Sequence, residues 1–104
     1  MARFDVYANP EPAERTLIPF LLDVQNDYIS GLATRVVIPL RAEAEFGRPA
    51  RGLNPVFLVQ EQAVVLDTAA MAALPAHLLR KPLLSLRAQH AVITTALDTL
   101  FGSF

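Results

Sequence analysis

The carboxyl-terminal stretch, residues 85–104, constrains the fold of this chain more than any other part of it. It contains no proline, and its first glycine is Gly102, so a helix can continue without a break as far as that residue. On such a helix the apolar residues gather on one side: Leu86, Val92, Ile93, Ala96, Leu97, Leu100 and Phe101. The sequence therefore predicts an amphipathic helix whose apolar arc can cover its own domain and still meet a partner.

Both ends of this helix carry local signals. The Ser85 hydroxyl can accept a hydrogen bond from a free backbone N–H of the first turn, and Gly102 can adopt the left-handed conformation that ends a helix. We expect Phe101 to pack either on the core or on a partner. We expect Phe104 to contact a partner, because no residue follows it to hold it in place.

Composition favours one small domain that associates with itself. The chain has 104 residues, which matches a single domain over residues 1–104. Hydrophobic residues make up 53% of it and charged residues only 18%, whereas an average domain has about 25% charged residues. A chain this small and apolar leaves apolar surface exposed as a monomer, so we expect a homodimer.

The same composition argues against several functional classes. No cysteine is present for a disulfide or a thiol nucleophile, and two histidines are too few for an ordinary zinc or haem site. A net charge of −1 argues against strong nucleic-acid binding. No apolar run reaches the length of a membrane span, and the first residues do not resemble a signal peptide. We therefore expect a cytoplasmic protein without a membrane anchor, a metal or a cofactor.

Short apolar runs in the rest of the chain predict β-strands. They lie at residues 3–7, 17–24, 34–40, 55–59 and 63–67. Pairing in the second run is expected to begin after Pro19, and Pro39 places a bulge, an end or an edge in the third. The last two runs form a hairpin through Glu61 and Gln62. In the first run Phe4 and Val6 fall on one face, and Arg3, Asp5 and Tyr7 on the other.

The connections between these runs are polar or rich in alanine. Residues 41–52 fit a long solvated loop with one helical turn, and residues 68–74 fit a short helical turn before Pro75. The whole pattern predicts a mainly β fold, with a small curled or barrel-like antiparallel sheet followed by the C-terminal helix.

Signals for catalysis are weak. The glycines are scattered, so no phosphate-binding loop is formed, and no nucleophile elbow is present. Asp23 and Asp27 could share a metal or a proton, but we favour hydrogen bonds from turn backbone N–H groups. His90 is interpreted as structural and His77 as surface. Arg41, Arg48 and Arg51 could contact an anion, although two glutamates among them favour a solvated loop. Binding is therefore favoured over catalysis.

Five segments, in order, resemble the CcdB toxin family. They are residues 4–7 (Phe-Asp-Val-Tyr), 22–27 (Leu-Asp-Val-Gln-Asn-Asp), 35–40 (Arg-Val-Val-Ile-Pro-Leu), 54–56 (Asn-Pro-Val) and 71–75 (Met-Ala-Ala-Leu-Pro). The C-terminal helix matches as well, so the resemblance covers essentially the whole chain. Residues 23–25 and 37–40 are its most specific parts.

This resemblance implies a fold and a function. CcdB-like proteins are homodimers with the SH3-like barrel fold shared with MazF and PemK, an antiparallel sheet plus a smaller sheet. They are toxins of toxin–antitoxin pairs that bind the A subunit of DNA gyrase and trap its complex with cleaved DNA. They are not enzymes, and they need no cofactor. A CcdA-like antitoxin neutralises them and joins them in repressing transcription of the operon.

The family contacts gyrase through a C-terminal Trp-Gly-Ile, supported by an apolar residue after the Asp-Val-Gln segment. The resemblance therefore implies a gyrase-binding set of Tyr28, Asp98, Phe101, Gly102, Ser103 and Phe104. We prefer an alignment in which Phe101 and Gly102 replace Trp-Gly, because it keeps an aromatic residue before the glycine. If the termini are aligned instead, Gly102 takes the tryptophan position. Phenylalanine offers a smaller face than indole for stacking on a guanidinium.

Two other functions remain open on the sequence. An endoribonuclease of the MazF or PemK type would need a basic groove and a catalytic set, such as Arg35 or Arg41 with an aspartate, and the net charge argues against it. A family member without toxicity, which serves only to bind antitoxin, is supported by the missing tryptophan.

Overall fold

A computed structural model describes residues 1–29 and 31–102. The strands are β1 (Asp5–Ala8), β2 (Phe20–Asp23), β3 (Thr34–Ala42), β4 (Val56–Val59), β5 (Gln62–Leu66), β6 (Ala72–Pro75) and β7 (Leu84–Ser85). The helix α1 spans His90–Phe101. Short 3₁₀ turns lie at η1 (Pro12–Glu14), η2 (Asp27–Ile29), η3 (Glu43–Glu45), η4 (Thr68–Ala70), η5 (Ala76–Leu78) and η6 (Arg87–Gln89). The predicted mainly β fold with one C-terminal helix is confirmed.

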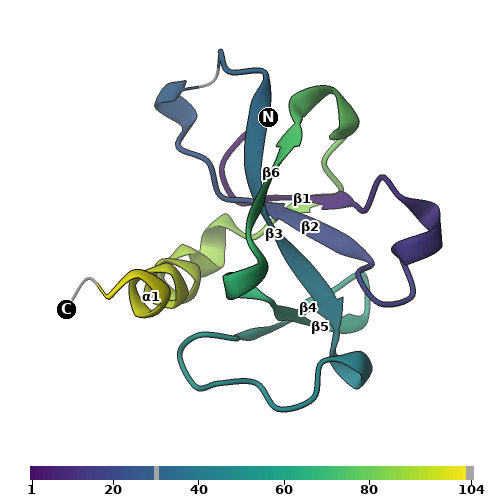
Figure 1. Cartoon of the computed structure of the whole chain (residues 1–104), viewed down its shortest axis with the longest axis vertical. Helices are drawn as coiled ribbons and strands as arrows, with labels where there is room; N and C mark the ends of the chain where they lie inside the picture. Colours follow the sequence, from purple (N-terminus) through teal and green to yellow (C-terminus); the bar gives the residue numbers. More distant parts are fainter. Residues whose placement is uncertain (30, 103–104) are drawn as a thin grey trace.

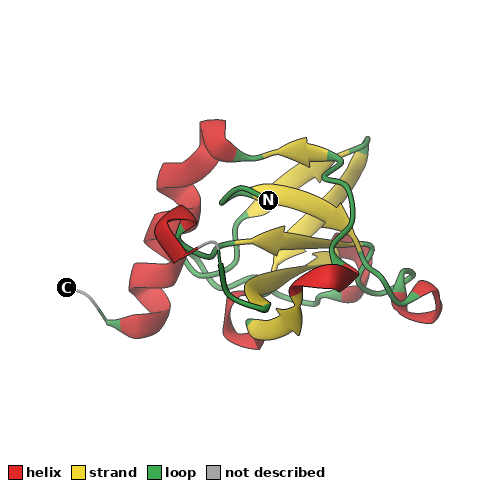
Figure 2. Ribbon diagram, turned by 90° about the horizontal axis from the view of Figure 1, so that it is seen from above, coloured by secondary structure: helices red, strands yellow, loops and turns green. Residues whose placement is uncertain are grey.

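The strands form one curled antiparallel sheet, consistent with an SH3-like barrel (Figures 1 and 2). Its order is β4-β5-β3-β2-β1-β7, and β6 pairs with β3 beside β5. One edge of β3 is therefore shared: its first half pairs with β6 and its last three residues pair with β5. This fork divides the sheet into a larger and a smaller part, and α1 packs across one face (Figure 2).

Pro39 lies inside β3, at the point where that edge changes partner. It pairs with Leu21 of β2 on one side, and its carbonyl accepts a hydrogen bond from the Asp67 N–H at 3.0 Å on the other. In an antiparallel strand, the backbone N and O of one residue point to the same neighbouring strand. The position where Pro39 lacks an N–H therefore points to the gap between β6 and β5. The proline is accommodated in a central strand because no ladder partner needs its donor there.

The hairpin of β4 and β5 turns at Gln60 and Glu61, one residue earlier than expected. Both have positive φ values, 48° and 65°, which is the type I′ geometry that suits the twist of two-residue hairpins. The hairpin itself is confirmed. The expected position was one residue too late, because neither Gln60 nor Glu61 is the Asn or Gly that normally marks such a turn in a sequence.

The main core lies between α1 and the sheet. Ile93 and Ala96 are fully buried, Leu86 is buried, and Leu97 packs against the core while staying half-buried. Val92 remains 47% exposed. The apolar arc of the helix is thus only partly covered within one chain, as its width predicts.

A second, smaller core covers the opposite face of the sheet. Tyr7, Leu21 and Val37 point to this face, and Leu79 from the connection between β6 and β7 packs over them. Tyr7 lies on the face opposite Phe4 and Val6, as predicted, and is only 1% exposed because the second core covers that face. The strands β6 and β7 were not predicted, because alanine has a low β-propensity and a two-residue strand has no periodicity.

The predicted cap at the start of the helix is wrong, whereas the predicted end is confirmed. The Ser85 hydroxyl accepts the Arg87 N–H at 3.1 Å, but α1 begins only at His90, and the residue before it, Gln89, makes no side-chain cap. At the other end Gly102 is left-handed, with φ of 71°, and its N–H donates to the Asp98 carbonyl at 2.8 Å. Within residues 1–29 and 31–102, no helix has both the length and the apolar character that crossing a bilayer requires.

Candidate functional site

The C-terminal tip of α1 presents an exposed aromatic side chain. Phe101 is 69% exposed, so of the two expected environments it does not take the core. Gly102 follows it in the left-handed conformation, which turns the chain away from the helix axis. Asp98, one turn earlier, is half-buried and accepts the Gly102 N–H with its carbonyl. Ser103 and Phe104 lie outside the described residues.

Tyr28 is the most exposed large apolar side chain described, at 96%. It lies in η2, which several hydrogen bonds hold in place. Its own N–H donates to the Asn26 side-chain oxygen at 2.9 Å. The neighbouring Asp27 accepts the Arg3 N–H at 2.7 Å and forms an ion pair with Arg87 at 3.5 Å. The aromatic ring is thus displayed by an ordered turn next to the start of the helical segment.

The structure brings part of the expected set together. Asp98, Phe101 and Gly102 form the tip of α1, whereas Tyr28 lies in a separate turn. Figures 1 and 2 place η2, a short blue turn in Figure 1, on the same side of the molecule as the end of α1. In Figure 1, however, η2 lies above the end of α1 along the vertical longest axis, so these two regions are separated.

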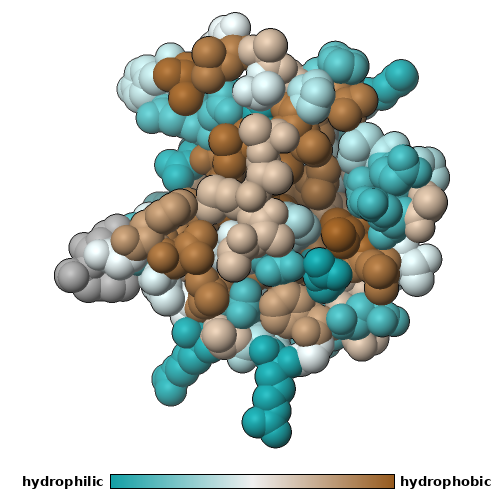
Figure 3. Space-filling model, viewed as in Figure 1, coloured by the Kyte–Doolittle hydropathy of each residue, from teal (hydrophilic) through white to brown (hydrophobic). Residues whose placement is uncertain are grey.

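An apolar face connects these two regions. In Figure 3 brown surface covers the η2 region and the end of α1, and a pale brown strip runs between them over β6. Ile29 and Leu32 are 49% and 54% exposed, and Ala72 and Ala73 of β6 are exposed as well. Sequence reasoning missed these residues. Their signal was the absence of charged residues from the turn after Asp27 and from the alanine-rich segment.

Asp23 is held by a buried ion pair. The Arg35 guanidinium donates from Nε to Oδ2 and from Nη2 to Oδ1, both at 2.9 Å, and the two side chains are 2% and 0% exposed. Burial raises the pKa of the Asp23 carboxyl, and the Gln25 N–H and Arg35 oppose that shift. Asp23 is therefore enclosed and unavailable to a ligand from solvent.

The two aspartates behave as favoured from the sequence. Asp23 accepts the Gln25 N–H at 3.0 Å and Asp27 accepts the Arg3 N–H, so both satisfy backbone donors. Among the residues that the structure describes, no group of three or more His, Asp or Glu side chains could hold a metal ion. A shared metal at Asp23 and Asp27 receives no support from this arrangement.

The remaining charged candidates are dispersed. Arg41 forms a partly exposed ion pair with Asp67 at 3.2 Å, and Arg48 and Arg51 are exposed on the 46–54 loop. His77 is exposed, and so is His90, whose ring centroid lies 6.3 Å from that of Phe4. None of these groups forms a compact reactive cluster with the others.

Comparison with known families shows to which family the chain belongs. The model of the CcdB protein family matches residues 3–102, nearly the whole chain. The chain belongs to the CcdB family. CcdB proteins are toxins of toxin–antitoxin systems, so this CcdB chain is the toxin half of such a pair. A comparison with curated proteins found no match.

Proposed function

We propose that this CcdB chain acts by binding the DNA gyrase A subunit and trapping the enzyme on cleaved DNA. The observation that carries the proposal is the exposed Phe101 at a helix tip that ends in Gly102. Tyr28 adds a second exposed ring on the same side of the chain. A solvated aromatic side chain on a rigid element has little conformational entropy to lose when a partner buries it.

The mechanism is binding without catalysis. Aromatic anchors buried at the centre of an interface typically contribute about 2 kcal/mol or more each. Phe101 offers a ring face to an apolar or guanidinium surface of the target, and the left-handed Gly102 lets the backbone approach closely because it has no side chain. Holding gyrase in one conformation requires differential affinity for that conformation, not a reactive group in the toxin.

The chain acts as a homodimer in this proposal. The exposed alanines of β6, between η2 and the end of α1, are the surface that a second copy covers, which leaves Tyr28 and Phe101 for the target. A twofold dimer presents two identical tips, which suits a twofold-symmetric target. Sedimentation at micromolar concentration is expected to give twice the 11.4 kDa chain mass; a species of single mass only would contradict this.

The physiological partners complete the proposal. A CcdA-like antitoxin neutralises the dimer, and the complex represses transcription of the operon. A cytoplasmic location follows from gyrase as the target. The ribonuclease alternative finds no support, because Arg35 is 1% exposed and Arg41 is paired with Asp67.

The test changes the tip and scores two readouts. Phe101→Ala, and separately deletion of Gly102 to Phe104, are expected to abolish growth arrest on expression and gyrase-dependent DNA cleavage in vitro. The matched control is Leu58→Ala, because Leu58 is equally exposed at 70% but lies on β4, away from the tip.

The outcomes separate the alternatives. Both tip variants should keep the melting temperature of the unchanged chain within a few degrees, since exposed terminal residues contribute few contacts. Undiminished toxicity of the truncated chain would refute the role of the tip. Wild-type protein that neither arrests growth nor promotes cleavage, yet binds its antitoxin, would identify a non-toxic family member.

A further inference from the structure

Arg87 connects the turn that displays Tyr28 to the segment that leads into α1. It lies in η6, directly before the helix. Its Nη2 donates to the Arg3 carbonyl at 3.2 Å and to the Asp27 carboxylate at 3.5 Å. The segment that contains Arg87 continues through α1 to Phe101. Arg87 therefore belongs to the element that carries one exposed ring and contacts the turn that carries the other.

The Asp27 carboxylate uses both of its oxygens on groups from outside its own turn. Oδ1 accepts the Arg3 N–H at 2.7 Å, and Oδ2 faces Arg87. Arg3 also donates from Nε to the Val24 carbonyl, just after β2, at 3.1 Å. The first residue of η2 is thus joined to the N-terminal segment, to the end of β2 and to the start of the helical segment.

The two arginines are themselves placed on a buried ring. The guanidinium carbon of Arg3 lies 4.8 Å from the ring centroid of Phe4, and that of Arg87 lies 5.5 Å from it. The Phe4 backbone is fixed on both sides, because its N–H donates to the Asp23 carbonyl at 2.7 Å and its carbonyl accepts the Leu86 N–H at 2.8 Å. Stacking on an aromatic face restricts an arginine side chain, so Arg87 presents its donors from a defined place.

The Tyr28 ring depends on this turn, because its side chain is almost fully exposed. Within η2, the Tyr28 N–H donates to the Asn26 side chain at 2.9 Å and the Ile29 N–H donates to the Asn26 carbonyl at 3.2 Å. These bonds shape the turn but do not attach it to the domain. Two side chains make that attachment: Gln25 donates from Nε2 to the Ile29 carbonyl at 3.3 Å, and Asp27 makes the contacts described above.

We propose that Arg87, acting through Asp27, is a positioning residue for Tyr28. It holds η2 relative to α1, so that Tyr28 and Phe101 meet one target surface together. This inference rests on the proposed function, because the gyrase A subunit is the target that the two rings contact. A turn that moves freely must be ordered on binding, and that ordering costs affinity. An exposed ion pair adds little to the stability of the fold, so its loss should change binding more than folding.

The first test measures the turn without gyrase. Backbone ¹⁵N relaxation of the full chain gives the order parameter of the Tyr28 amide, which is about 0.85 for rigid backbone and below about 0.6 for flexible backbone. Asp27→Asn keeps an oxygen for the Arg3 N–H but places an uncharged amide against Arg87, and Arg87→Gln removes the guanidinium. Both variants should lower the order parameter by about 0.1 or more on this scale. Their melting temperatures should stay within a few degrees of the unchanged chain.

The second test measures affinity for the gyrase A subunit. Arg87→Gln should weaken binding about threefold, which is the size expected for an exposed charge contact. In a Tyr28→Ala chain the same substitution should have no further effect, because Arg87 acts through that ring. A loss of equal size in both backgrounds would overturn the proposal, since Arg87 would then contact the target itself or support the fold.

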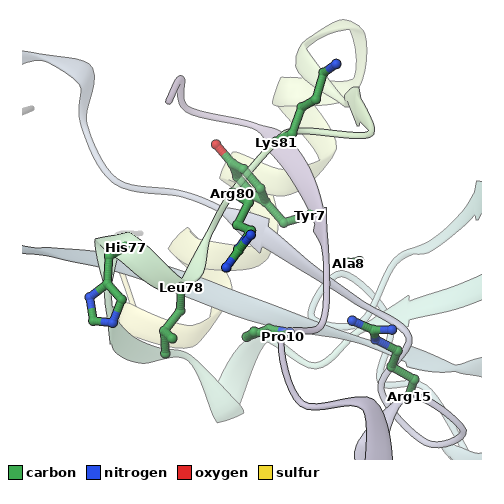
Figure 4. Close-up of a pocket in the computed structure, with 8 residues that line it drawn as sticks. All are labelled: Tyr7, Ala8, Pro10, Arg15, His77, Leu78, Arg80 and Lys81. Atoms are coloured by element: carbon green, nitrogen blue, oxygen red, sulfur yellow. The ribbon is translucent and has the colours of Figure 1, made fainter.

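Arg80→Gln is the matched control. Arg80 is also an exposed arginine, but it lies in the connection between β6 and β7, where it lines a cavity beside Tyr7 (Figure 4). The ion pairs of the described residues do not include it. This substitution should change neither the order parameter of Tyr28 nor the affinity for gyrase.

The outcomes keep this inference separate from the proposed function. An unchanged order parameter in both Asp27→Asn and Arg87→Gln would overturn the positioning role of Arg87. Failure of the unchanged chain to bind gyrase would refute the proposed function instead. The order parameters alone would then decide whether Arg87 positions Tyr28.

Discussion

The buried pair of Asp23 and Arg35 should dominate the response of this fold to a single conservative substitution. Asp23→Asn keeps the shape of the side chain and one oxygen that can accept the Gln25 N–H. It places an amide N–H₂ against an Arg35 donor, and it leaves a buried guanidinium without a counter-charge. Removing one partner of a buried pair costs about 3–5 kcal/mol. Small domains have a total stability of about 5–15 kcal/mol.

Urea unfolding followed by circular dichroism, at one fixed protein concentration, measures this loss. With m values of about 1–3 kcal/mol per molar urea, the midpoint should fall by more than about 1 M. Asp67→Asn is the matched control, because it makes the same chemical change in the partly exposed pair with Arg41 and should cost less than about 1 kcal/mol.

A double variant separates the pair from its surroundings. Asp23→Asn combined with Arg35→Met keeps an acceptor for the Gln25 N–H and removes the buried guanidinium, so it should recover most of the stability that Asp23→Asn loses. The reasoning is refuted if Asp23→Asn costs no more than Asp67→Asn. It is also refuted if the double variant is less stable than Asp23→Asn, since the loss would then come from packing and not from the unpaired charge.

Two further predictions concern Tyr7 and the β4–β5 turn. In a Tyr28→Phe chain, Tyr7 is the only tyrosine. Its pKa, followed by phenolate absorbance, should lie above 10 in the folded protein and at about 10 in denaturant. Because the unfolded state then loses its proton first, stability should fall as pH rises above about 10, and Tyr7→Phe should lessen that fall; titration at the denatured midpoint would contradict this. Replacing Gln60-Glu61 by Asn-Gly should raise the free energy of unfolding by roughly 1 kcal/mol, because both positions have positive φ; an unchanged urea midpoint would count against the turn geometry.

Local signals in the sequence determined most of the secondary structure. Gly102 ends α1, pairing in β2 begins at Phe20 after Pro19, and the apolar arc of the helix places Ile93 in the core. These features depend on residues within a few positions of each other, where propensity and periodicity act directly. The sequence left Phe101 open between the core and a partner, and the structure excludes the core, because the side chain is 69% exposed.

Only the tertiary structure decided which residues meet across the sheet. Arg35 finds Asp23 because the register of β2 and β3 brings them together, and neither residue carries a local signal for the other. Tyr7 is buried because the distant Leu79 folds over its face of the sheet. The alternation of residues along a strand predicts that Tyr7 and Phe4 point to opposite faces of the sheet. It does not predict which other residues cover each face. Contacts between residues far apart in the chain depend on which strands pair and on how the chain connects them. A local sequence pattern does not contain that information.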